Sequence, residues 1–224
     1  MIPWMKLDTA RVPGADGELR LMRRGTEFSI MLGSNELMNS RLSGSEAALA
    51  TLACKKIEAV KRPHLLIGGL GMGFTLRAAL AVLGPDARIS VAELVPAVVA
   101  WARGPMAEIF GGCLDDPRVR VGQDDVLNAI RAHKSAFNAI LLDVDNGPEG
   151  LTRSGNDALY DLKGLKQAHA ALRPNGVLSV WSSGPNAAFS KRLRSAGFDV
   201  NEVTVRATGK GGGARHVIWI AVRN

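Results

Sequence analysis

The most informative segment of this chain is Leu65-Leu-Ile-Gly-Gly-Leu-Gly-Met-Gly-Phe-Thr75. A short apolar run is stopped by glycines, and an apolar stretch of helical length follows, which is typical of a buried strand, a tight turn and a helix. Gly69, Gly71 and Gly73 give the turn the spacing GxGxG, and glycine lets a ligand approach the backbone closely. Phe74 stands where the dinucleotide-binding spacing GxGxxG has its third glycine, so close packing and ligand binding both remain open.

An acid follows the next predicted strand. That strand covers Arg88–Ala92, and Glu93 comes directly after it, 20 residues beyond Gly73. In open α/β sheets a carboxylate at this strand end accepts hydrogen bonds from ribose hydroxyls. A solvated strand end is the structural alternative. Combined with the glycine turn, Glu93 favours a site for a nucleoside.

Two further acids, Asp124 and Asp125, follow the strand predicted over Val119–Val121. An acid at this point can accept a hydrogen bond from the exocyclic amine of adenine. Two adjacent acids can also begin the next helix, where negative charge suits the helix dipole. Both interpretations remain open, and Asp125 is the better candidate because it directly precedes the apolar pair Val126-Leu127.

Asp143 ends the strand predicted over Ala139–Leu142, and Asp145 lies in the Gly/Pro-containing loop that follows. Carboxyl ends of central strands face the ligand crevice of such sheets. A carboxylate there can bind a substrate ammonium or take a proton from an amine. Asp143 and Asp145 are therefore the candidate catalytic residues, and an Asx turn in the loop is the alternative for both.

Strands and helices alternate over most of the chain, which predicts a doubly wound parallel sheet covered on both faces. The remaining predicted strand of this series is Val177–Trp181, and the predicted helices are Gly73–Leu83, Ala97–Phe110, Val126–His133, Asp157–Leu172 and Ala187–Ala196. The end differs, because only a glycine-rich link separates the strands predicted over Val200–Thr208 and His216–Val222. No helix fits that link, so the pair must be antiparallel.

The first 40 residues have another pattern. Two alternating segments, Glu18–Arg24 and Glu27–Leu32, predict a β-hairpin, and an Ala/Leu-rich helix is expected from Ser43 to about Lys61. We therefore divide the chain into an N-terminal β-hairpin extension, residues 1–42, and a Rossmann-like domain, residues 43–224.

Composition excludes several classes of protein. The 224 residues are 46% hydrophobic and 22% charged, an ordinary balance for a globular domain. No apolar run approaches the roughly 20 residues that span a bilayer, and Pro3 and Asp8 interrupt any signal peptide. Cys54 and Cys113 form no metal-binding pattern, so we expect no metal and a reducing cytoplasm. The net charge of +7 is spread out with few aromatics, which disfavours nucleic-acid binding.

Taken together, the glycine turn, the strand-end acids and the antiparallel final pair resemble the class I S-adenosylmethionine-dependent methyltransferase fold. Within it the chain is most similar to the spermidine synthase (polyamine aminopropyltransferase) branch. That branch has a GGGDGG run, a ribose-binding acid and an Asp-containing segment that ends in Gly-Pro; Gly68–Gly73, Glu93 and Asp143 to Pro148 match them. The resemblance implies a seven-stranded, mostly parallel sheet with an antiparallel last strand, a donor bound over Gly69–Gly73, and a homodimer.

Two departures from that branch bear on the reaction. Gly71 stands where the branch has an Asp that holds the amino group of the aminopropyl donor, and Glu46-Ala-Ala-Leu49 stands where it has a Tyr-His pair. Gly71 leaves backbone N–H groups at a helix start, which suit a carboxylate. We therefore favour methyl transfer from S-adenosylmethionine to a small acceptor, for which an amine is one candidate, with Asp143 orienting or deprotonating it. Aminopropyl transfer from decarboxylated S-adenosylmethionine to a polyamine is the first alternative, and a non-catalytic nucleoside-binding module is the second.

Overall fold

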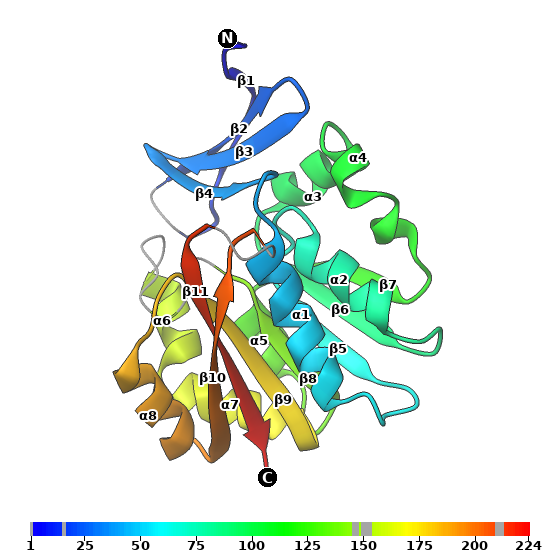
Figure 1. Ribbon diagram of the computed structural model, residues 1–224, viewed down its shortest axis with the longest axis vertical. Helices are drawn as coiled ribbons and strands as arrows, with labels where there is room; N and C mark the ends of the chain where they lie inside the picture. Colours follow the sequence, from blue (N-terminus) through cyan, green and yellow to red (C-terminus); the bar gives the residue numbers. More distant parts are fainter. Residues whose placement is uncertain (1, 15–16, 145–147, 149–153, 209–212) are drawn as a thin grey trace.

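The computed structural model describes residues 2–14, 17–144, 148, 154–208 and 213–224. The described strands form a small N-terminal sheet and a larger sheet below it (Figure 1). The small sheet has the order β1-β2-β3-β4 and is antiparallel throughout; its strands are β1 (Met5–Arg11), β2 (Glu18–Arg24), β3 (Glu27–Leu32) and β4 (Asn35–Asn39).

The hairpin predicted from the sequence is the central pair of this small sheet, β2 and β3, with Leu21 opposite Ile30. Strands β1 and β4, which the sequence analysis did not predict, extend it on either side. Most of β1 is exposed, so its residues lack the apolar alternation of a half-buried strand. Leu21 and Ile30 are fully buried and belong to the same apolar core as the first helix of the larger domain.

The larger sheet has the order β10-β11-β9-β8-β5-β6-β7. Its strands are β5 (His64–Gly68), β6 (Arg88–Glu93), β7 (Val119–Gln123), β8 (Phe137–Leu142), β9 (Leu172–Ser182), β10 (Phe198–Arg206) and β11 (Arg215–Arg223). Neighbours from β7 to β9 are parallel, whereas β11 runs antiparallel to both β9 and β10. The prediction of a seven-stranded, mostly parallel sheet with a reversed last strand is confirmed.

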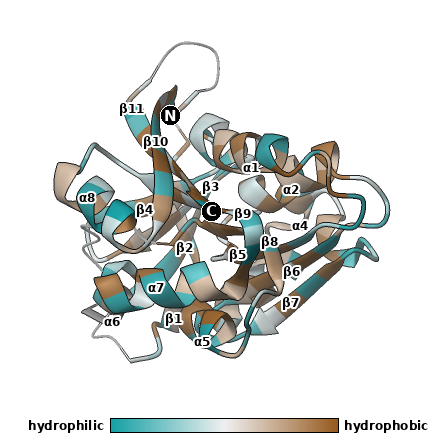
Figure 2. Cartoon of the chain, turned by 90° about the horizontal axis from the view of Figure 1, so that it is seen from below, coloured by the Kyte–Doolittle hydropathy of each residue, from teal (hydrophilic) through white to brown (hydrophobic). Residues whose placement is uncertain are grey.

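Helices cover both faces of this sheet (Figures 1 and 2). One face and its core involve α1 (Gly44–Lys56), α2 (Phe74–Val82), α3 (Pro96–Arg103), α4 (Ala107–Phe110) and the 3₁₀ turn η1 (Cys113–Asp115). The other involves α5 (Val126–Arg131), α6 (Ser154–Tyr160), α7 (Leu162–Ala171) and α8 (Ala187–Ser195). Strands enclosed in this way are buried along their whole length and mostly apolar, as in β8, where all six residues are buried and only Asn138 is polar.

Two predicted helices are interrupted. The helix predicted over Ala97–Phe110 ends at Arg103, because Gly104 and Pro105 follow and proline cannot continue an α-helix. The one predicted over Asp157–Leu172 breaks at Asp161, whose Oδ1 accepts a hydrogen bond from the Gly164 N–H at 2.6 Å. The apolar periodicity continues through Asp161, but its side chain caps a new helix, so the chain forms two helices instead of one.

The parallel register places the candidate residues together. Gly68 lies opposite Ala92 on one side and Leu142 on the other, and Glu93 lies opposite Gln123. The loops that leave these strands therefore emerge at one edge of the sheet.

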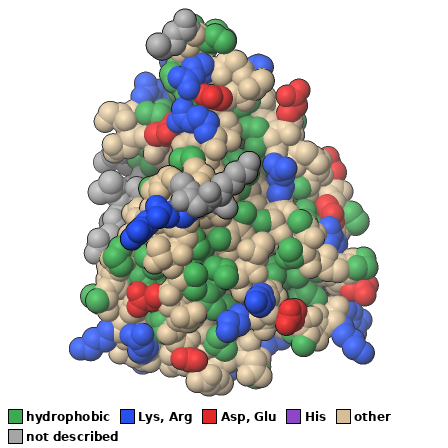
Figure 3. All heavy atoms as spheres, in the orientation of Figure 1, with side chains coloured by type: hydrophobic (Ala, Val, Ile, Leu, Met, Phe, Trp, Pro, Cys, Tyr) green, Lys and Arg blue, Asp and Glu red, His purple; other side chains and the backbone are tan. Residues whose placement is uncertain are grey.

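On the face shown in Figure 3, Lys and Arg side chains are interspersed with Asp and Glu side chains. Among the described residues, each helix is too short or too polar to cross a membrane.

Candidate functional site

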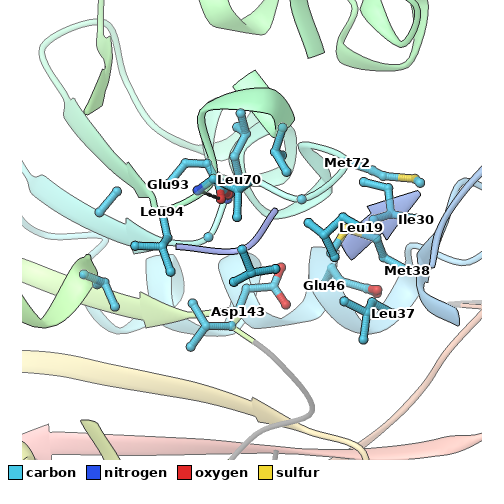
Figure 4. Close-up of a pocket in the computed structure, with 18 of the residues that line it drawn as sticks. Leu19, Ile30, Leu37, Met38, Glu46, Leu70, Met72, Glu93, Leu94 and Asp143 are labelled. Atoms are coloured by element: carbon cyan, nitrogen blue, oxygen red, sulfur yellow. Dashed lines mark hydrogen bonds between the residues drawn. The ribbon is translucent and has the colours of Figure 1, made fainter. Parts of the chain in front are cut away.

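A cavity of about 200 Å³ lies between the N-terminal sheet and the carboxyl ends of the parallel strands (Figure 4). Six of the residues selected from the sequence line it, namely Gly69, Gly71, Glu93, Asp124, Asp125 and Asp143. Gly73 is not part of the lining, because it is the N-cap of α2 and packs against the ring of Phe110. Asp145 and most of its loop lie outside the described residues.

The glycine turn forms the floor of the cavity beside Asp143. Gly69 has a φ of +86°, and a Cβ there would lie 2.5 Å from the backbone oxygen of Asp143, so the turn and the end of β8 touch at backbone level. Gly71 has a φ of +50°, and a Cβ there would meet the Met38 Sδ at 3.2 Å. The N-terminal sheet thus reaches the position where the spermidine synthase branch has an Asp.

Glu93 ends β6 as a buried carboxylate, 7% exposed. Its Oε2 accepts a hydrogen bond from the Leu70 N–H and its Oε1 one from the Val95 N–H, both at 2.8 Å. Burial raises the pKa of Glu93, and the backbone hydrogen bonds oppose this shift. The backbone N–H groups of Gly71 and Leu94 also act on this carboxylate, so main-chain donors hold it in the cavity wall. Ribose binding by Glu93 stays a prediction.

Asp124 and Asp125 line the cavity where β7 leads into α5. Asp125 is the N-cap of α5, and its Oδ1 accepts a hydrogen bond from the Leu127 N–H at 2.9 Å. Asp124 Oδ1 accepts from the Asp125 N–H at 2.7 Å and from Asn128 Nδ2 at 2.9 Å. The helix-start interpretation therefore holds for Asp125, while adenine binding by either acid stays a prediction.

Asp143 is held by a residue of the quoted glycine segment. The Thr75 hydroxyl donates a hydrogen bond to Asp143 Oδ2 at 2.6 Å. The pKa of Asp143 is raised to about 7, mainly by burial and also by the charge of Glu46, and the bond from Thr75 opposes both effects. A carboxyl group that titrates near pH 7 can both accept and release a proton during a reaction.

Glu46 is a site residue that the sequence analysis did not select. It lies in the first turn of α1 and lines the cavity, in the same part of Figure 4 as Asp143. Its only signal in the sequence was its place in the tetrapeptide that replaces the Tyr-His pair of the similar family.

Apolar side chains also line the cavity, and most of them come from the N-terminal sheet: Val12, Leu19, Ile30, Leu32, Leu37, Met38 and Trp181.

Within the described ranges, the structure contains no group of three or more His, Cys, Asp or Glu side chains that could hold a metal ion. The carboxylates of the cavity are arranged along its length, with Glu93 near Leu94 and Glu46 near Leu37 and Met38 (Figure 4). This arrangement suits an elongated organic ligand that presents hydroxyls at one end and a cation at the other.

No family model matches this chain. It is 29% identical over 158 residues to polyamine aminopropyltransferase 1 of Streptomyces coelicolor, a match that covers 66% of this chain and 29% of that protein. It is 33% identical over 149 residues to a polyamine aminopropyltransferase of Mycobacterium tuberculosis, covering 62% of this chain and 27% of that protein. The match thus spans less than a third of the length of these relatives.

Two solved structures resemble the whole described fold. The spermidine synthase of Thermotoga maritima superposes with a TM-score of 0.77 at 17% identity, covering 98% of this chain and 73% of that one. A spermidine synthase in complex with the transition state analogue AdoDATO gives a TM-score of 0.76 at 16% identity, covering 98% and 72%. The chain therefore has the spermidine synthase-like form of the class I methyltransferase fold, as the motifs indicated.

Proposed function

We propose that this chain transfers an aminopropyl group from decarboxylated S-adenosylmethionine to an amine, in a reaction of the spermidine synthase type. The observation that carries the proposal is the pair of carboxylates, Glu46 and Asp143, at one end of the cavity beside the glycine turn. The charge of Glu46 acts on Asp143 strongly enough to contribute to its raised pKa. Two acids that repel each other in a buried site favour a cationic ligand between them.

This pair distinguishes the two donors. S-adenosylmethionine carries a carboxylate and an ammonium on its tail, whereas the decarboxylated donor carries an ammonium alone. A tail carboxylate placed beside Glu46 and Asp143 would add a third negative charge in a partly desolvated site, which is unfavourable. The sequence analysis favoured methyl transfer because Gly71 removes an acid. Glu46 supplies an acid to the same cavity, so that argument loses its force.

The similar proteins support the same choice. The relatives reported above are named for aminopropyl transfer to polyamines, and none of them supports methyl transfer. We extend their reaction to this chain as a proposal, with a polyamine as the first acceptor to test. A homodimer and a cytoplasmic location remain predictions from the resemblance.

We assign the following roles in donor binding and proton transfer to the described residues. Glu93 accepts hydrogen bonds from the donor ribose, Gly69 and Gly71 admit the donor against the backbone, and Asp124 and Asp125 lie where an adenine amine would be. Asp143 takes a proton from the acceptor ammonium, because only the neutral amine has the lone pair needed for attack. Its pKa of about 7 suits this step at neutral pH.

The atoms and charges of the reaction balance. The amine nitrogen forms a bond to the propyl carbon, and the bond from that carbon to the sulfonium breaks with both electrons going to sulfur. The products are 5′-methylthioadenosine, an alkylated ammonium and the one proton removed from the acceptor.

Asp145 is a second catalytic candidate, and this proposal rests on the sequence alone.

A direct comparison of donors tests the proposal. Calorimetric titration should give a dissociation constant for the decarboxylated donor at least tenfold below that for S-adenosylmethionine, a difference of about 1.4 kcal/mol. Putrescine should be consumed with release of 5′-methylthioadenosine, and Asp143→Asn should abolish this. Asp86→Asn, at an exposed position, is the matched control. Tighter binding of S-adenosylmethionine with a methylated product would refute the proposal, and a donor that binds but is never consumed would favour the nucleoside-binding module.

A further inference from the structure

Two hydrogen bonds connect Glu46, one member of the acidic pair, through Ser45 to His216 of β11. The Ser45 hydroxyl donates to Glu46 Oε2 at 2.8 Å, and the same Ser45 oxygen lies 2.9 Å from Nδ1 of His216. Ser45 is 1% exposed, so water does not compete for its hydroxyl. His216 is half-buried at the start of β11 and reaches solvent, while its ring packs edge-on against Trp181 of the cavity lining at 4.8 Å.

Glu46, Ser45 and His216 each have the hydrogen-bonding capacity that is needed to pass a proton along these two bonds. A hydroxyl donates one proton and accepts another, and an imidazole can carry a proton on either nitrogen. Burial lowers the pKa of His216, while the charge of Glu46 raises it; Glu46 is the charged group acting on this ring among the described residues. While Ser45 donates to a charged Glu46, Nδ1–H of His216 donates to Ser45. Once Glu46 takes up a proton the two bonds can reverse, so that Glu46 donates to Ser45 and Ser45 donates to Nδ1 of the tautomer that carries its proton on Nε2. The ring can then accept the proton at Nδ1 and release the one on Nε2 to solvent.

The proposed reaction needs a route by which a proton can leave the buried acidic pair. One proton must leave the acceptor ammonium in each turnover, and Asp143 is buried and faces Glu46 and Thr75. A donor and an acceptor in the cavity would cover this side of the acidic pair and separate it from bulk water. His216 could not be selected from the sequence, because its contact with Ser45 joins residues 171 positions apart.

We propose that Ser45 and His216 form a proton relay for the acidic pair, carrying the proton taken up by Glu46 and Asp143 to the surface. This inference rests on the proposed function. Ser45 and His216 touch no reacting atom and act through Glu46, so they are positioning and relay residues. Holding Glu46 in place and conducting a proton are separable, because glutamine at position 216 could still donate a hydrogen bond to Ser45 but could not change its protonation state.

The first test measures turnover. His216→Ala and His216→Gln should both lower kcat at least tenfold, with the dissociation constant of the donor unchanged within twofold. Added imidazole should restore much of the activity of His216→Ala. Ser45→Ala should be impaired without rescue, because the bond to Glu46 is then missing. His169→Ala is the matched control, since His169 is also half-buried, with a burial-lowered pKa and an edge-on ring contact to Phe198.

Three results would overturn the relay: His216→Ala with the kcat of the control, His216→Gln with wild-type kcat, or no rescue by imidazole in a variant that folds and binds donor normally. A second measurement does not depend on turnover. The His216 ring should titrate at lower pH in Glu46→Gln than in the wild type when followed by NMR, because a favourable charge is lost. An unchanged titration would refute the coupling. A wild type that shows this coupling but consumes neither donor would instead refute the proposed function.

Discussion

Asp143→Asn should make the protein more stable at pH 8 while removing its activity. In the folded protein the Asp143 carboxyl has a pKa of about 7, against 3.8 for an ordinary aspartate, with burial as the main cause and Glu46 as the second. An aspartate whose pKa is raised on folding favours its protonated form in the native state. The native state therefore binds more protons than the unfolded state between pH 4 and pH 7, and stability falls as the pH rises through that window.

The size of the effect follows from the shift. A difference of about 3 pKa units corresponds to about 4 kcal/mol at most, reached above pH 7, and it accumulates at about 1.4 kcal/mol for each pH unit between 4 and 7. The asparagine amide has nearly the same shape and can still accept the hydrogen bond from Thr75, but it has no charge to desolvate. The variant should match the wild type near pH 4 and exceed it increasingly up to pH 7.

Urea unfolding at five pH values from 4 to 8 measures this difference, with Asp86→Asn as an exposed control that should track the wild type throughout. Glu46→Gln should reduce the pH dependence, since it removes the second cause of the shift. A stability difference between Asp143→Asn and wild type that stays constant with pH would refute the assignment of a raised pKa to Asp143.

Three other substitutions test the donor end of the cavity. Glu93→Gln should weaken binding of 5′-methylthioadenosine by about 1.5–3 kcal/mol in calorimetry, because a charged acceptor for the ribose is lost; equal affinity would argue against the ribose assignment. Gly71→Asp should increase the affinity for the decarboxylated donor relative to S-adenosylmethionine, with Gly71→Asn as its uncharged control, since Asp and Asn both tolerate a positive φ. Gly69→Ala should lower the unfolding midpoint and donor affinity, because its Cβ would lie 2.5 Å from the Asp143 oxygen. Gly84→Ala, with open space around its Cβ, should leave both nearly unchanged.

Most of the larger sheet could be predicted because its signals are local. The apolar runs, the glycine turn after β5 and the acids after β6, β7 and β8 depend on residues close in sequence, and parallel pairing then brings those acids to one edge. The helix ends were harder: Asp161 interrupts a stretch whose periodicity continues through it, and a single cap decides the break. Strand β1 was missed because an exposed strand shows little apolar alternation.

Local sequence patterns were enough to predict the larger sheet, the glycine turn and the positions of Glu93 and Asp143 at strand ends. Which other residues join them depends on how distant segments of the chain pack against one another. Glu46 shares the cavity with Asp143 and acts on its pKa because α1 packs against β8 and β9, and His216 reaches Ser45 because β11 is inserted next to β9. Such contacts join residues about 100 or more positions apart in the chain. They are set by how apolar helix faces are buried against the sheet, which no short stretch of sequence encodes.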